Sequence, residues 1–177
     1  RFRRRRAYVI LAGAYLFKTL AMLPFLLTFP GGLLEHAPVT GGPQSAIWVW
    51  IFWHILFPLV VLAAVLTHRR RSDSVLPLGR LGPTHALAVV VAIELAGAVL
   101  IAVTQFHDWL PALIDPTRDS LTPAFYLTGW LAALATAVPA FICWRTARRE
   151  QTLLYLWLAL TLFANLAIMA MGLMMPS

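Results

Sequence analysis

The chain has 177 residues, of which 60% are hydrophobic and 12% are charged, and its formal net charge is +7. A soluble domain carries roughly 25% charged residues, so this composition excludes an ordinary water-soluble globular domain. The basic residues gather in 1–6, 69–80 and 145–149, at the ends of apolar stretches. This distribution is typical of the flanks of membrane helices, and it argues against nucleic acid as a partner.

The apolar stretches are long enough to cross a membrane, since a helix needs about 20 residues to span about 30 Å of hydrocarbon. In chain order, we expect transmembrane helices over 7–29, 46–67, 85–106, 123–144 and 152–175. The linkers 30–45 and 72–84 are rich in Gly and Pro and are expected to be irregular. A short interfacial turn anchored by Trp109 is expected in the linker 107–122. The sequence therefore predicts an all-α, polytopic membrane bundle of about five helices in one domain covering 1–177.

The basic clusters predict the orientation of this bundle. All three lie at the same end, and positively charged loops stay on the cytoplasmic side, so we expect a cytoplasmic N-terminus. The loops at the other end carry four acids, namely Glu35, Asp108, Asp115 and Asp119, against one Arg118. Five crossings place residue 177 outside. We therefore expect a piece of a longer chain, in which a sixth helix precedes any cytoplasmic domain.

Strongly polar residues lie deep in four of the predicted helices. At about 1.5 Å per residue, Lys18, His54, Glu94 and Asn165 lie about 14 to 20 Å from a helix end. One interpretation is a buried sensing or binding cluster, in which Lys18 and Glu94 neutralise each other while His54 and Asn165 complete hydrogen bonds. The other is a static ion pair that fixes helix register, with His54 a satisfied core histidine or Lys18 reaching toward the interface. In a paired arrangement, Glu94→Gln is expected to destabilise the bundle or shift its pH response.

Tryptophans crowd the start of the second predicted helix, at Trp48, Trp50 and Trp53. Trp48 and Trp50 fit an aromatic belt at the outer interface, whereas Trp53 and His54 lie deeper and are expected to line an aromatic pocket. The candidate ligand-binding or sensing residues are therefore Lys18, Trp50, Trp53, His54, Glu94 and Asn165.

Cofactor chemistry has weak support in this sequence. Haem remains an alternative through His54, the one histidine expected at mid-membrane, although a paired site needs a second histidine at matching depth. A metal site from His36, His107 and an outer-loop acid is conceivable, but the spacing does not demand it. No cofactor and no metal site is therefore predicted. No hydrolase triad, phosphate-binding glycine loop or paired carboxylates appear, so we predict no catalytic residue and no enzymatic activity for this piece.

Short motifs distinguish the first two predicted helices and the loop between them. They are Tyr15-Leu16-Phe17, Leu27-Thr28-Phe29-Pro30-Gly31, Gly42-Pro43-Gln44-Ser45, Trp48 followed by Phe52-Trp53-His54, and Phe57-Pro58-Leu59. With these motifs the sequence resembles the fourth type of bacterial membrane-associated sensor (MASE) domain. A fainter likeness lies in 153–159, and Ala63-Ala64 departs from the more polar helix end that the family leads us to expect.

The resemblance implies a multi-pass sensor in the bacterial inner membrane. Such domains precede a cytoplasmic output domain, often a diguanylate cyclase that makes cyclic di-GMP and sometimes a histidine kinase, which this sequence lacks. By the same analogy we expect a homodimer or membrane-complex partners, with the lipid bilayer around them. Two alternatives stay open: an accessory structural subunit of a larger bacterial membrane complex, and a haem-binding membrane anchor.

Overall fold

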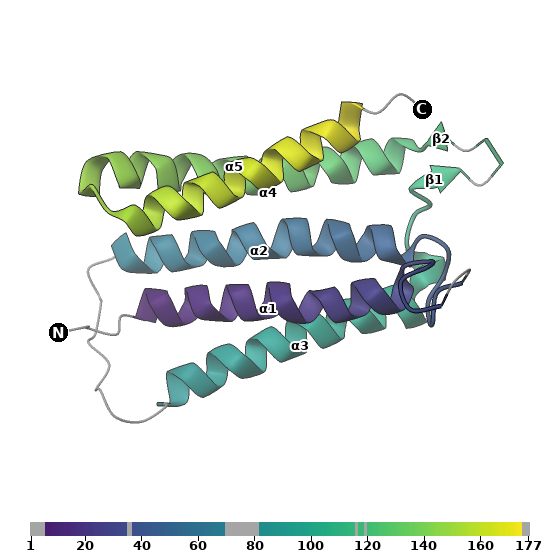
Figure 1. The fold of residues 1–177 in the computed structure, drawn as a ribbon, viewed down its shortest axis with the longest axis horizontal. Coiled ribbons are helices and arrows are strands. Elements are labelled where there is room, and N and C mark those ends of the chain that lie inside the picture. Colours follow the sequence, from purple (N-terminus) through teal and green to yellow (C-terminus); the bar gives the residue numbers. More distant parts are fainter. Residues whose placement is uncertain (1–5, 35–36, 70–81, 116, 119, 175–177) are drawn as a thin grey trace.

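The computed structural model describes residues 6–34, 37–69, 82–115, 117–118 and 120–174. It confirms the predicted all-α bundle (Figure 1). Five helices in the described residues are long and apolar enough to cross a membrane. They are α1 (Arg6–Thr28), α2 (Ser45–Arg69), α3 (Pro83–Gln105), α4 (Pro123–Glu150) and α5 (Leu153–Met174).

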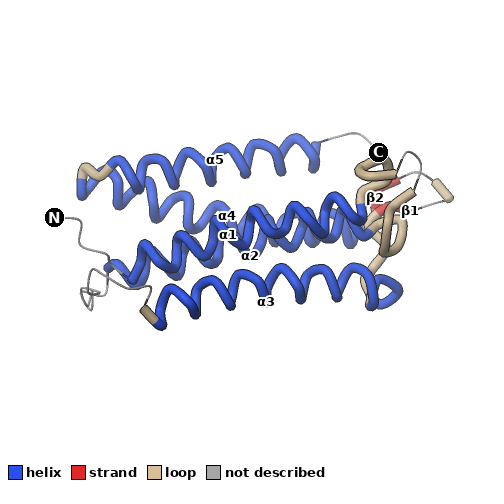
Figure 2. Tube along the Cα trace, turned by 60° about the horizontal axis from the view of Figure 1, so that its bottom comes forward, coloured by secondary structure: helices blue, strands red, loops and turns tan. Residues whose placement is uncertain are grey.

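The helices pack in the order α3, α1, α2, α4, α5, which is not their order in the chain. Helix α1 packs against α2 and α3, α2 packs also against α4 and less extensively against α3, and α4 packs against α5. Figures 1 and 2 show the helix axes running roughly side by side along the long dimension of the molecule. Helices α3 and α5 therefore lie at the two edges of the bundle, and α2 connects its two parts.

The outer surface of the bundle is apolar, as expected for a surface in contact with lipid. Leu127 and Leu153 are 73% and 72% exposed, and Trp130 is 66% exposed. The core between the helices holds smaller or tightly packed side chains, including Phe17, Val61 and Ala140. Apolar side chains thus cover both the interior and the exterior, which distinguishes a membrane bundle from a soluble one.

Helix α4 is longer than predicted, because the expectation ended it at Trp144 with its apolar stretch. The helix continues through a polar turn to Glu150, where Arg and Ala favour helical structure outside hydrocarbon. It ends at Gln151, which adopts a left-handed conformation with φ 50°, and the Gln151 N–H donates to the carbonyl of Ala147. The arginines in its last turn lie at the negative end of the helix dipole, where a positive charge is stabilising.

The linker between α3 and α4 is more ordered than its sequence predicts. A short 3-10 helix spans His107–Trp109, slightly before the interfacial turn that was expected from Trp109 onward. Two unexpected strands follow, β1 (Ile114–Asp115) and β2 (Ser120–Leu121), which pair antiparallel with Ile114 opposite Leu121. Thr122 then caps α4 by accepting the N–H of Phe125.

Candidate functional site

His54 is buried on α2 among aromatic rings, at 2% exposure. Its Nδ1 lies 2.7 Å from the carbonyl oxygen of Trp50. Because a carbonyl only accepts, Nδ1 must carry the proton, and Nε2 is the nitrogen left for another partner. The Trp50 and Trp53 rings lie 4.1 and 5.4 Å from the imidazole, centre to centre. Three of the predicted site residues therefore form one aromatic group within α2.

Lys18 of α1 contacts α2 close to this group, at Phe57, three residues after His54. Its Nζ lies 4.8 Å from the centre of the Phe57 ring, a cation–π contact that partly replaces a counter-ion. Lys18 forms no ion pair with a carboxylate in the described part of the chain, so an aromatic face, and not an acid, accommodates this ammonium group.

Glu94 is not part of the cluster, and the expected neutralisation of Lys18 by Glu94 is wrong. Glu94 lies at the midpoint of α3, is exposed, and makes no hydrogen bond or ion pair with any described residue. The reason is helical phase: Ala92, Ala96 and Val99 form the buried face of α3, and Glu94, two residues after Ala92, points the other way. Comparable depth did not imply a shared face.

Asn165 lies on α5, on the opposite side of α4 from α1. It is 7% exposed, and its side chain makes no hydrogen bond with a described residue. Met169, one turn later on the same face, accepts a weak hydrogen bond of 3.8 Å from Thr136 of α4. Asn165 is therefore buried against α4, and the structure does not bring it to His54.

Thr136 of α4 contacts α2 at His54 and α5 at Met169. It was not predicted as a site residue. Its Oγ1 lies 3.3 Å from the backbone carbonyl oxygen of His54 and 2.9 Å from that of Ala132, and it donates its proton to these acceptors. The His54 carbonyl has no partner within α2, because residue i+4 is Pro58, which lacks an N–H. A proline four residues after His54 was the available signal for a polar partner on a neighbouring helix.

Replacing Thr136 with Val should therefore reduce the free energy of unfolding by about 1 kcal/mol, the usual contribution of one hydrogen bond. In a Pro58→Ala background the cost should shrink, because an alanine at this position would supply the missing N–H to the His54 carbonyl. Detergent unfolding of the four proteins measures this coupling. Thr128→Val is the matched control, since the Thr128 hydroxyl bonds only within α4. Equal costs in both backgrounds would show that Thr136 does not serve the His54 carbonyl.

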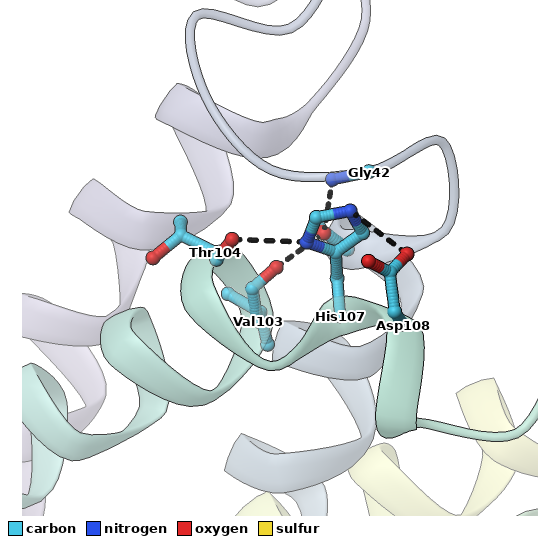
Figure 3. Close-up of polar contacts among 6 residues, drawn as sticks. Gly42, Val103, Thr104, His107 and Asp108 are labelled. Carbon is cyan, nitrogen blue, oxygen red and sulfur yellow. Dashed lines mark hydrogen bonds and ion pairs between the residues drawn. The ribbon is translucent and has the colours of Figure 1, made fainter.

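A second polar cluster lies at the end of the bundle opposite the first residue of α1 (Figure 3). Ser45, the first residue of α2, donates from Oγ to the carbonyl oxygen of Val103 at 2.5 Å and accepts the N–H of Gly42 at 2.9 Å. These two contacts connect the linker before α2 to the last turn of α3. The motif Gly42-Pro43-Gln44-Ser45 therefore acts as a structural joint.

His107 lies above this joint (Figure 3). Its Nδ1 donates to the carbonyl oxygen of Thr104 at 2.9 Å, and its Nε2 lies 3.2 Å from Oδ1 of Asp108. Gly42 packs so closely that a Cβ on it would lie 2.6 Å from Cδ2 of the His107 ring. Glycine is therefore required at 42 to leave room for the imidazole, and the Asp108 contact gains a hydrogen bond only when Nε2 carries a proton.

Gln44 and Trp48 hold the linker that leads into α4. The Gln44 Oε1 accepts the backbone N–H groups of Leu113 and Ile114, and its Nε2 donates to the Ile114 carbonyl at 2.8 Å. The Trp48 Nε1 donates to the carbonyl of Pro111 at 3.2 Å. Trp48 is 8% exposed, so it is an inward-facing anchor rather than the member of an aromatic belt that was expected.

Two cavities adjoin these clusters. One of about 250 Å³ lies at the joint formed by Gly42-Pro43-Gln44-Ser45 and is lined by Gln44, Trp48, His107 and Asp108, among others. Another of about 260 Å³ is lined by apolar side chains around Trp50, namely Phe25, Phe29, Ala46, Ile47 and Phe125. An aromatic pocket was expected at Trp53 and His54, but these two residues do not line this cavity, which lies beside Trp50 instead. Trp53 leaves a buried Nε1 without a partner among the described residues.

Asp115 is an acidic residue in the linker between α3 and α4. Oγ1 of Thr117 donates to Asp115 Oδ1 at 2.6 Å, and the Thr117 N–H donates to the same oxygen at 2.8 Å. These bonds lower the pKa of the Asp115 carboxyl, first through the Thr117 hydroxyl and then through its N–H. Asp115 is therefore a stable negative charge in the linker between α3 and α4 at neutral pH.

Metal binding and haem binding remain hypotheses from the sequence. His36 lies outside the described residues, and no group of three His, Cys, Asp or Glu side chains within the described residues has metal-ligand proximity. For haem, Nε2 of His54 remains the candidate axial atom, and a visible absorption band lost in His54→Ala is the test.

A model of the family MASE4, described as a membrane-associated sensor, integral membrane domain, matches residues 1–177. The chain belongs to the MASE4 family. No curated protein and no solved structure matches the chain. The MASE4 match extends well beyond the motifs that carry the resemblance, and it establishes a multi-pass integral membrane sensor domain.

Proposed function

We propose that this MASE4 domain detects a condition at the outer face of the bacterial inner membrane and relays it to a cytoplasmic output domain, a diguanylate cyclase or a histidine kinase. The observation that carries the proposal is the joint formed by Gly42-Pro43-Gln44-Ser45, which is called the outer joint because the proposed orientation places it outside. There Ser45, the first residue of α2, binds the end of α3, and Gln44, the residue before it, binds the linker that leads into α4. A change in this joint moves three helices at once, which is what a relay requires.

The interior supplies a route from the joint toward α5. Thr136 of α4 contacts the His54 carbonyl on α2 and the Met169 sulfur on α5. A shift of α4 therefore changes contacts on both neighbours. Two features of α2 support a role for this region in tuning the route, namely the contact of Lys18 with Phe57 and the buried Trp53 Nε1, which has no partner among the described residues.

The proposed orientation rests on the basic clusters. Helices α1 and α3 begin, and α2 and α4 end, at one end of the bundle (Figure 1), and the clusters 1–6, 69–80 and 145–149 adjoin these helix ends. By the positive-inside rule this end is cytoplasmic. A phosphatase fused after Thr117 should be active in the periplasm, whereas the same fusion after Arg149 should be inactive. The reverse result would invert the domain and would overturn an outer input site.

The relay is tested in the full-length protein, with the activity of its own cytoplasmic domain as the readout. Gly42→Ala should change that activity markedly, because the added Cβ displaces the His107 ring. Gly82→Ala is the matched control, since nothing lies within 4 Å of a Cβ there. Circular dichroism and size-exclusion chromatography verify that both variants fold. An output that is unaltered in a folded Gly42→Ala protein would contradict the proposal.

The proposed assembly is a homodimer, because cyclase and kinase output domains work in pairs. Cross-linking of the full-length protein in native membranes tests it. Wild-type protein that remains monomeric under these conditions while its output is active would contradict the dimer and leave the relay within one chain.

A further inference from the structure

A separate cavity lies at the turn between α4 and α5, at the basic end of the bundle. It measures about 270 Å³ and is lined by Trp144, Arg148, Gln151, Thr152, Leu153 and Leu156, together with Ala147. Every one of these residues is described, and none of them is acidic. The lining is therefore partly cationic and polar and partly aromatic and aliphatic, and the latter part is called the apolar wall.

Arg148 supplies the charge. Its guanidinium carbon lies 5.2 Å from the centre of the Trp144 ring, which holds the side chain beside the cavity. It forms no ion pair with a carboxylate in the described part of the chain, so its donors are available to a ligand. Arg145 and Arg149 adjoin it, against the single acid Glu150 in the same turn. A guanidinium with open donors is suited to bind the oxygens of a phosphate.

The turn between the two helices brings further donors to the cavity. Gln151 closes α4 in a left-handed conformation, and α5 begins two residues later at Leu153. The first turn of α5, whose backbone N–H groups have no partner within the helix, borders the cavity beside the last turn of α4, where Arg148 offsets the negative end of the α4 dipole. Thr152 offers a hydroxyl at the same place.

The apolar wall identifies the kind of phosphate. Leu153 is 72% exposed, Leu156 is 43% exposed, and the neighbouring Trp157 is 67% exposed. These side chains continue from the cavity onto the lipid-facing surface of α5, where an acyl chain would lie against them. A free phosphate ion would gain nothing from this wall, whereas a phospholipid contacts both parts.

We propose that this cavity binds the headgroup phosphate of an anionic phospholipid. Arg148 is the principal phosphate ligand, the first turn of α5 and Thr152 donate to the same oxygens, and Trp144, Leu153 and Leu156 pack against the glycerol and acyl region. This lipid site is independent of the input site at the outer joint.

The test uses the full chain in nanodiscs of phosphatidylcholine that contain a minor fraction of phosphatidylglycerol, followed by native mass spectrometry of the released protein. Wild type should retain phosphatidylglycerol in preference to phosphatidylcholine. Arg148→Gln should lower that retention about tenfold, the effect of losing one charge-assisted interaction. Arg118→Gln removes an exposed arginine at the other end of the bundle and should leave retention unchanged. Leu153→Gln should lower retention as well, because it makes the apolar wall polar.

Three results would overturn the proposal. Equal retention by wild type and a folded Arg148→Gln protein would show that the cavity does not select the headgroup. An equal loss in Arg118→Gln would show that overall charge, and not this cavity, attracts the lipid. Displacement of phosphatidylglycerol by inorganic phosphate, with Leu153→Gln unchanged, would assign the cavity to a soluble phosphate instead of a lipid.

Discussion

Gln44→Ala should lower the free energy of unfolding by about 3 kcal/mol, since it removes three hydrogen bonds of about 1 kcal/mol each. Two of them satisfy the N–H groups of Leu113 and Ile114, and the third satisfies the Ile114 carbonyl. Leu113 is fully buried at 0% exposure, so water cannot easily replace the lost acceptor. Unfolding in sodium dodecyl sulfate, followed by circular dichroism, measures the change.

Gln105→Ala is the control for this prediction. Gln105 is exposed at the end of α3, and its side chain makes no hydrogen bond with a described residue. Its replacement should change stability by less than about 0.5 kcal/mol. Gln44→Glu keeps the acceptor oxygen and loses the donor, so its cost should lie between those of the two alanine variants. A Gln44→Ala protein as stable as the Gln105→Ala control would show that the linker before α4 holds its conformation without this side chain.

Glu94→Leu should raise stability by about 2 kcal/mol, because a charged side chain at mid-membrane costs about 2.5 to 3.5 kcal/mol by insertion scales. Glu94 is exposed among apolar neighbours, with Val90 51% and Ile93 53% exposed. This is the opposite of the effect expected from an ion pair with Lys18, for which Glu94→Gln would destabilise the bundle. Thermal denaturation in detergent and in lipid nanodiscs measures the sign.

Ile101→Leu serves as the matched control, since Ile101 is 53% exposed on the same helix and stays apolar. It should leave the melting temperature unchanged. A clear loss of stability in Glu94→Leu, with the control unaffected, would mean that the Glu94 carboxyl has a partner outside the described residues, such as a second copy of the chain.

The helices of this domain could be predicted from the sequence because each is a long apolar stretch, and membrane thickness fixes their length. The end of α4 was missed because hydropathy reports where hydrocarbon ends, not where helical hydrogen bonding ends. Arg145 to Glu150 remain helical in a polar setting. The distinction is physical: burial in lipid and helix formation coincide in the middle of a span and separate at its ends.

The candidate site was predictable only where sequence spacing determines proximity. Trp50, Trp53 and His54 share one helix, and their contact follows from their separations. Glu94 and Asn165 were placed by depth alone, and depth contains no information on which face of a helix a side chain occupies. Which face of α3 or α5 is buried depends on which helices they pack against. That packing depends on shape complementarity across the whole bundle.

The joint at the start of α2 shows a second limit on prediction from the sequence. Gly42-Pro43-Gln44-Ser45 was recognisable as a family motif, yet nothing local reveals that Gln44 binds the backbone of residues 113 and 114, far along the chain. A glutamine side chain is able to pair with any exposed peptide group. Its partner is settled only when α2 and the linker before α4 are brought together.

Thr136 has one hydroxyl proton and two backbone acceptors, the Ala132 carbonyl in its own helix and the His54 carbonyl across the interface. The hydroxyl remains hydrogen-bonded whether α4 is docked on α2 or has moved away from it. Of these hydrogen bonds, only the one to the His54 carbonyl depends on the contact between the two helices, so it adds about 1 kcal/mol to the apolar packing that holds α2 against α4. Pro58 removes the N–H donor for that carbonyl from α2, and the interface thereby acquires a polar contact that only the correct register of α4 on α2 satisfies.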